Sequence, residues 1–252
     1  MEESMLRRLP ADSDQSSPDA MTEYSVGYKS SSYSSSSSSQ SSFRRVLKAP
    51  GRPIAVRTEY VTDSRTLLVV RPQGDRQSSR AYKIEDSNGV TLFTATGRKF
   101  SVRACREFWD ASGLPLFELH RKMSLKNTWS VTLPGSKYAN IATASAGWSV
   151  GDFKITFQNR AAVESKKEEE KILTLEVEKY GNALASFDVV DGDRKVAEIR
   201  ESIPHNEKLA LLPGSKKGYR PVLDVTVLPG VDLSLIAIIT VMASDWVFSS
   251  NY

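Results

Sequence analysis

The sequence predicts a mainly β protein: a closed antiparallel barrel built around one apolar helix close to the C-terminus. Two observations lead to this fold class. Short segments of alternating apolar and polar residues follow one another from about Ile54 to Leu228. The most apolar long segment, residues 232–248, comes after all of them. A helix that is apolar on every face must be surrounded, and a closed sheet can surround it.

The segment 232–248 carries the signals of a buried helix. Asp232 follows Pro229 and Gly230 and is a favourable N-cap. The run 233–243 is apolar except for Ser234 and Thr240, and it is much shorter than the ~20 residues that cross a bilayer. We therefore expect a core helix rather than a membrane span.

About ten to twelve strands are expected. Turns rich in Asp, Asn and Gly at 85–89, 110–113 and 191–193 predict three hairpins that look like repeated units. The charged run 164–171 is interpreted as a solvated loop or hairpin extension, and residues 203–206 as a turn. The expected strands are 66–71, 81–84, 90–95, 107–109, 114–121, 128–133, 153–159, 172–179, 185–190, 195–200 and 219–228.

Composition divides the chain at residue 43. Residues 1–43 hold three basic and six acidic residues, and 11 of the 13 residues from Ser30 to Ser42 are serine. Such a tail cannot bury enough apolar surface to fold, so we expect a disordered linker or a phosphorylation target. Residues 44–252 form the predicted folded domain, with a net charge of +7. This charge is compatible with an anionic partner without requiring one.

Single-residue chemistry is sparse. Cys105 is the one cysteine and there are two histidines, so we expect no disulfide, no metal site and no cofactor. The N-terminal segment has no apolar stretch of the secretory type. The sequence therefore indicates a cytoplasmic protein with no transmembrane span, with peripheral attachment to a membrane as an alternative.

Residues 110–125, which contain the pattern Gly113-Leu-Pro-Leu, together with Trp129 and Val131, resemble the central motif of the LURP-one-related family. That family belongs to the tubby C-terminal-like superfamily. The segments 82–89 and 232–248 match its preceding hairpin and its terminal helix, so the resemblance covers roughly residues 50–248. It implies a closed antiparallel barrel of about twelve strands around a central apolar helix. The superfamily includes phosphoinositide-binding tubby proteins and phospholipid scramblases, and the family itself has no settled molecular activity.

The leading functional hypothesis is a non-enzymatic binding or scaffold module. It would engage phosphoinositide or other anionic headgroups, or a protein partner in signalling or stress response. Neighbouring strands could gather several basic side chains into a patch suited to a phosphate headgroup. The alternatives are a solvated barrel face and, for Arg121, an inward orientation towards a buried acid. Nucleic acid is not an expected ligand, because no basic-aromatic module is present. The candidate patch comprises Arg98, Lys99, Arg103, Arg106, Arg121 and Lys122.

Three other interpretations stay open. The segment Gly147-Trp-Ser149-Val-Gly151 fits the G-x-S-x-G pattern of a hydrolase nucleophile, with Asp188 or Asp191 and His205 as partners, but a strand rather than a helix is expected after it. Cys105 and His120 would be a thiol and a base on adjacent strands, with no orienting acid evident. Phosphorylation of the Ser-rich tail would make the chain a regulated signalling protein.

Overall fold

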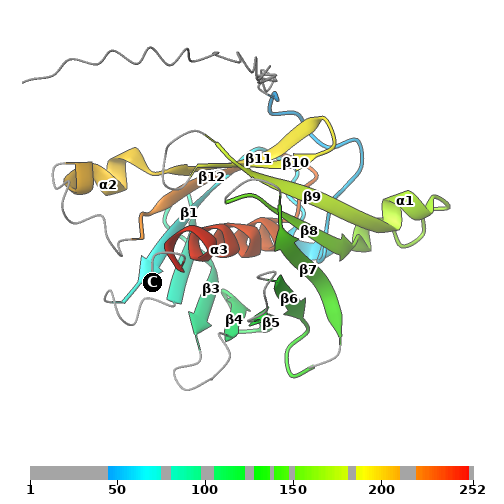
Figure 1. Cartoon of the computed structure of the whole chain (residues 1–252), viewed down its shortest axis with the longest axis horizontal. Coiled ribbons are helices and arrows are strands. Elements are labelled where there is room, and N and C mark those ends of the chain that lie inside the picture. Colours follow the sequence, from blue (N-terminus) through cyan, green and yellow to red (C-terminus); the bar gives the residue numbers. More distant parts are fainter. Residues whose placement is uncertain are drawn as a thin grey trace, which may run out of the picture. The chain divides into compact units, whose positions relative to one another are not determined.

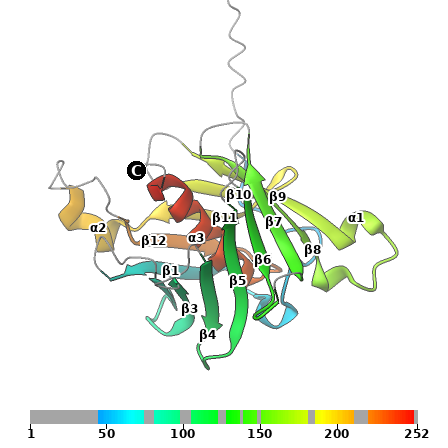
Figure 2. The same ribbon diagram turned by 60° about the horizontal axis from the view of Figure 1, so that its bottom comes forward.

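A computed structural model of the protein describes residues 45–74, 81–97, 105–122, 128–136, 139–147, 151–180, 186–210 and 220–249. In these residues, twelve strands form a closed barrel in the order β1-β12-β11-β10-β9-β8-β7-β6-β5-β4-β3-β2. Neighbouring strands are antiparallel throughout, and the strands surround helix α3 (Figures 1 and 2). The predicted fold class is confirmed.

The strands are β1 (Thr66–Gln73), β2 (Ala81–Asp86), β3 (Thr91–Gly97), β4 (Cys105–Asp110), β5 (Pro115–Lys122), β6 (Thr128–Thr132), β7 (Asn140–Ala146), β8 (Phe153–Gln158), β9 (Ile172–Lys179), β10 (Phe187–Asp191), β11 (Arg194–Glu201) and β12 (Leu223–Val227). The α-helices are α1 (Glu168–Lys171), α2 (Ile203–Ala210) and α3 (Leu233–Ser249). Short 3-10 turns lie at Thr58–Tyr60 and Arg160–Ala162.

Two of the three predicted hairpin turns, at 85–89 and 110–113, form around an aspartate that organises the chain. Asp86 Oδ1 accepts hydrogen bonds from the main-chain N–H groups of Asn88 and Val90, both at 2.8 Å. Gly89 then takes a φ of 81°, which a side chain would disfavour. The β4–β5 turn repeats this arrangement around Asp110. These local bonds set the register of the strands, which determines the face that each side chain occupies.

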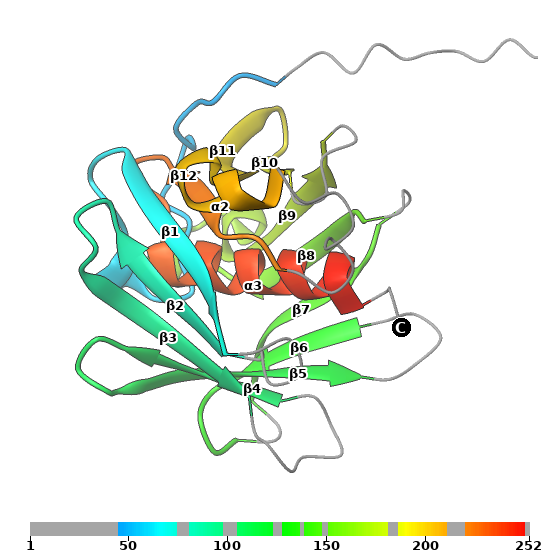
Figure 3. The same ribbon diagram turned by 90° about the vertical axis from the view of Figure 1, so that its left-hand side faces the viewer.

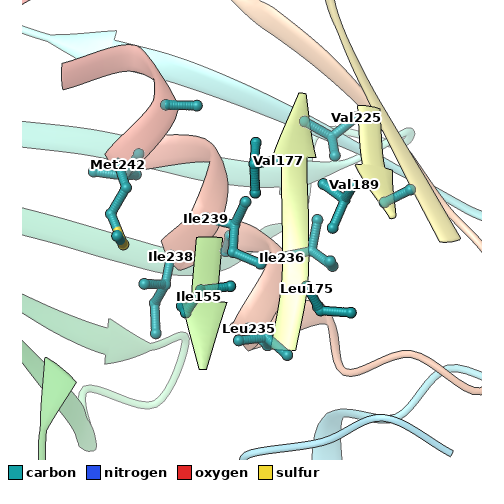
Figure 4. Packing of buried hydrophobic residues seen from close by; sticks show 14 of the residues in the cluster. Ile155, Leu175, Val177, Val189, Val225, Leu235, Ile236, Ile238, Ile239 and Met242 are labelled. Carbon is teal, nitrogen blue, oxygen red and sulfur yellow. The ribbon is translucent and has the colours of Figure 1, made fainter. Parts of the chain in front are cut away.

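Helix α3 fills the barrel. A helix with its side chains is roughly 10–12 Å across, wide enough to occupy the space that twelve strands enclose. Figure 4 shows Ile236 and Ile239 of α3 beside Leu175, Val177 and Val189 of β9 and β10. The buried apolar side chains of α3 are Leu235, Ile236, Ala237, Ile238, Ile239, Val241, Met242 and Ala243.

Two elements differ from expectation. Strand β7 was not predicted, because its sequence Asn-Ile-Ala-Thr-Ala-Ser-Ala has few of the large β-branched or aromatic residues that signal strands. Residues 203–206 were predicted as a turn, but they begin α2, with Pro204 in its first turn, where proline is tolerated. The charged run was expected to be a solvated loop, and it contains the one-turn helix α1 with no buried residue.

The barrel has two distinct ends, which we name after the aspartates of α3. At the Asp232 end, β1 begins, α3 begins, and the tight hairpins join β2 to β3 and β4 to β5. Because the strands alternate in direction, the connections β1–β2, β3–β4, β5–β6, β7–β8, β9–β10 and β11–β12 all join at the opposite, Asp245 end. Figure 3 shows α3 running from one end to the other.

Candidate functional site at the Asp245 end

A buried ion pair connects α3 to the barrel wall at this end. Arg106 of β4 donates from Nε to Asp245 Oδ2 at 2.8 Å and from Nη2 to Oδ1 at 2.7 Å. Arg106 is 6% exposed and Asp245 is 3% exposed. The two parallel bonds are the geometry in which a guanidinium binds a carboxylate most strongly. The pair thus fixes the C-terminal part of α3 to β4.

Three further side chains complete the cluster. The Tyr82 hydroxyl of β2 lies 3.1 Å from Asp245 Oδ1 and 3.0 Å from Ser244 Oγ. Arg220, which precedes β12, donates to the Tyr82 hydroxyl at 2.8 Å and pairs with Asp245 at 3.1 Å. Burial raises the pKa of Tyr82 well above its ordinary value, with the Asp245 charge adding to the effect. Tyr82 therefore remains a neutral hydrogen-bonding group.

The position of Arg106 does not fit the surface patch expected for it. Its guanidinium lies inside the barrel, 5.1 Å from the centre of the Tyr82 ring, and its Nη1 is buried without a hydrogen-bond partner. Phe108, two residues further along β4, is 1% exposed and shares the inner face. This alternation was the signal that could have placed Arg106 inside. An inward arginine that pairs with a buried acid is found at Arg106. Arg121, for which the sequence suggested an inward orientation, shares the inner face with Phe117 and Leu119.

The other patch residues remain predictions. Arg121 of β5 stacks its guanidinium 5.7 Å from the ring centre of Trp129, the residue directly opposite it on β6. Lys122 ends β5, and its side chain lies outside the described part of the structure. Arg98, Lys99 and Arg103 also lie outside the described residues, between the end of β3 at Gly97 and the start of β4 at Cys105.

The six connections that join at the Asp245 end have an unusual charge composition. The segments 75–80, 98–104, 123–127, 148–150, 181–185 and 211–219 lie outside the described residues, and their sequences contain a single acid, Asp75. The remaining parts of the same connections add two acids, Asp152 and Glu207, and two basic residues, Lys208 and Arg220. Sequence and topology together thus assign an excess of positive charge to this end. The basic residues of these segments are Arg76, Arg80, Arg98, Lys99, Arg103, Lys126, Lys216 and Lys217.

Cys105 and His120 are closer than the sequence suggested. They are directly opposite each other in the β4–β5 ladder, so their side chains project from the same face. The acid that the sequence did not reveal is Glu118, whose Oε2 lies 3.3 Å from His120 Nε2. The register, which the sequence alone did not supply, brings these three residues together.

The proposed hydrolase triad is not assembled among the described residues. Ser149 lies outside them, and the strand β8 rather than a helix follows it. His205 Nδ1 lies 2.8 Å from Ser202 Oγ, and its Nε2 lies 2.7 Å from Arg71 Nη2. Asp188 pairs with Arg200 at 2.6 Å. A triad needs the acid on one histidine nitrogen and the serine on the other.

A surface pocket of about 370 Å³ lies at the Asp232 end. Its charged lining is mixed in sign, because Arg52 and Arg160 face it together with Glu164 and Glu170. Arg52 also pairs with Asp191 at 3.2 Å. A lining of both signs does not favour a polyanionic ligand here.

None of the helices in the described residues has both the length and the apolar character needed to cross a bilayer. The family model described as LURP-one-related matches residues 66–244, a span that contains all twelve strands and most of α3. No curated protein matches the chain. A crystal structure of a protein from Arabidopsis thaliana superposes with a TM-score of 0.51 at 20% identity, over 77% of this chain and 98% of that chain. At this identity the likeness concerns the fold alone.

Proposed function

The chain belongs to the LURP-one-related family, and on this premise we propose that it is a non-enzymatic binding module that docks on anionic phospholipid headgroups through its Asp245 end. The observation that carries the proposal is the charge of the connections at that end, which hold ten basic residues against three acids in their sequences. A cluster of this size attracts anionic lipid by about 1 kcal/mol for each basic residue near the surface.

Two features of the fold support an external rather than an internal ligand. The barrel interior is occupied by α3, whose apolar side chains from Leu235 to Ala243 are buried. The inward cation Arg106 is bound to Asp245 and not directed to solvent. The residues proposed to contact headgroups are therefore Arg98, Lys99, Arg103 and Lys122, whereas Arg121 shares the inner face with Phe117 and Leu119 and is left out. Such a role predicts a cytoplasmic protein that associates peripherally with a membrane.

The test is co-sedimentation of the full chain with phosphatidylcholine vesicles, with and without phosphoinositide, at two salt concentrations. We expect phosphoinositide-dependent binding that weakens at the higher salt, because screening shortens the range of the attraction. The triple variant Arg98→Glu, Lys99→Glu and Arg103→Glu should lower the affinity by at least about 100-fold, since three lost attractions of about 1 kcal/mol each exceed two factors of ten.

A matched control carries the same change in net charge at the opposite end. Arg160, Lys166 and Lys167 are exposed residues of the Asp232 end, and their reversal to Glu should leave vesicle binding nearly unchanged. Equal loss in both triple variants would indicate attraction by net charge alone and would contradict docking by the Asp245 end. No binding at low salt would remove the lipid proposal and favour a protein partner.

A further inference from the structure

Three kinds of metal-ligating side chain meet on one face of β4 and β5. Cys105 and His120 form a direct cross-strand pair, and Glu118 lies two residues before His120 on the same face. Their ligand atoms, the Cys105 Sγ, a Glu118 carboxylate oxygen and a His120 ring nitrogen, all lie within 4.8 Å of one another. Because Phe117 and Leu119 face the core, this cluster lies on the outer side of the barrel.

The spacing is close to that of a metal site. In a tetrahedral zinc site with bonds of 2.0–2.3 Å, the ligand atoms are roughly 3.5 Å apart. His120 Nε2 and Glu118 Oε2 are already 3.3 Å apart. Small rotations of the side chains would therefore bring the remaining atoms into bonding positions around a single ion.

Neighbouring groups orient the ligands. The main-chain N–H of Gly135 donates to Glu118 Oε1 at 3.0 Å, which holds that carboxylate with its other oxygen towards His120. Thr132 Oγ1 lies 3.2 Å from the same His120 Nε2 that faces Glu118, so it is placed as a further ligand and not as an outer-shell partner. The cluster is partly shielded, with Cys105 7% exposed and the Glu118 and His120 side chains 13% and 27% exposed. An outer-shell bond, here from Gly135 to Glu118, and partial exclusion of water are usual supports of a metal site.

We propose that Cys105, Glu118 and His120 bind one Zn²⁺ ion, with water or the Thr132 hydroxyl as the fourth ligand. A thiolate and an imidazole select zinc over magnesium or calcium, which prefer oxygen alone. A thiolate and a carboxylate together also balance the two positive charges of the ion. This inference departs from the expectation of no metal site, and it is independent of the proposed lipid binding.

The test is a titration of the full chain, first freed of metal by a chelator, with Co²⁺ as a spectroscopic substitute for Zn²⁺. Cys105 is the sole cysteine, so a thiolate-to-cobalt charge-transfer band can arise only from this site. We expect the band to saturate at one equivalent, to show tetrahedral d–d absorption, and to disappear when Zn²⁺ is added.

Variants locate the ion. Cys105→Ser should abolish the band, and His120→Gln or Glu118→Gln should weaken Co²⁺ binding by at least about tenfold. His205→Gln, which removes the one other histidine, is the matched control and should leave the titration unchanged. Far-UV circular dichroism checks folding, and if Cys105→Ser does not fold, the other two variants decide. The absence of a band in the native chain, or a band unchanged in both His120→Gln and Glu118→Gln, would overturn the proposal.

Discussion

The two ends of α3 each bury one aspartate, but the two carboxylates are stabilised in different ways. Among the described residues, Asp232 has no cationic hydrogen-bond donor and instead accepts bonds from main-chain N–H groups, at 2.8 Å from Arg57 and 2.7 Å from Ser234. Asp245 is paired with the guanidinium groups of Arg106 and Arg220. A buried carboxylate at the helix start is thus held by main-chain N–H groups, some local and some from Val56 and Arg57, whereas the carboxylate near the helix end relies on cationic side chains from distant segments.

The contrast extends to the pKa of Asp232. Burial raises the pKa of this carboxyl to about 6, although the hydrogen bonds from Ser234, Arg57 and Leu235 act in the opposite direction. Dipoles of the main chain thus offset only part of the cost of removing the charge from water. At the Asp245 end, the guanidinium charges of Arg106 and Arg220 offset the cost of burying the carboxylate.

The largest expected effect comes from removing the acid at the Asp245 end. Asp245→Ala leaves Arg106 buried without its carboxylate partner, and breaking a buried pair in this way costs about 3–5 kcal/mol. The free energy of unfolding, measured by chemical denaturation, should fall by this amount. The double variant Arg106→Met with Asp245→Leu should recover part of the loss, since it removes both charges. If the double variant were no more stable than Asp245→Ala, the stabilisation by the pair would not come from charge compensation alone.

The next effect is a pH dependence specific to the Asp232 end. The folded-state pKa of about 6 exceeds the ordinary value of 3.8, so the folded protein binds this proton more tightly than the unfolded chain. The contribution to stability is therefore fully present below about pH 4 and is lost as the pH rises through 6, by about 3 kcal/mol. Denaturation of native protein and Asp232→Asn between pH 4 and 7 should show this slope in the native protein alone.

The control for that slope is the exposed variant Asp193→Asn, measured over the same pH range. An equal slope in native protein and Asp232→Asn would show that other groups carry the pH dependence. It would also mean that the hydrogen bonds to Asp232 compensate for its burial more completely than we infer.

The smallest effect concerns the turns of the Asp232 end. Gly192, between β10 and β11, has a φ of 61°, and a Cβ built there meets no atom within 4 Å. Gly192→Ala should therefore cost about 1 kcal/mol from backbone conformation alone. At the other end, Gly151 has a φ of 99° and its Cβ would lie 2.7 Å from Lys179 Cδ, so Gly151→Ala should cost more. Thermal denaturation of the two variants compares them, and a larger loss for Gly192→Ala would contradict this order.

The fold was predictable because its strongest signals are local. Each of these signals determines the structure of only a few neighbouring residues. They are Asp232 after Pro229-Gly230, the apolar run that follows it, and the Asp-containing turns. Strand β7 escaped prediction because its inward side chains, Ala142 and Ala144, are too small to produce an alternating pattern. Helix α2 was not predicted because residues 203–206 contain a proline, which is as typical of a turn as of the first turn of a helix.

The site was less predictable, because it depends on which strands pair and in which register. The sequence placed Cys105 and His120 on adjacent strands but gave no means to align them with Glu118. Arg106 was assigned to the surface by its charge, whereas alternation with Phe108 placed it inside. A buried arginine needs a buried acid, and the acid lies 139 residues further along the chain, on α3.

The location of α3 after every strand has a consequence for biosynthesis. The apolar inner faces of β1 to β12 are synthesised before the helix that covers them. Strand β1 also cannot complete its pairing until β12, its neighbour in the closed sheet, has been synthesised. Contacts between segments so far apart in sequence form slowly, and exposed strand edges invite association in the meantime. Completion of the barrel should therefore be a late event that follows the synthesis of α3. The nascent chain is expected to need protection by chaperones until α3 has emerged.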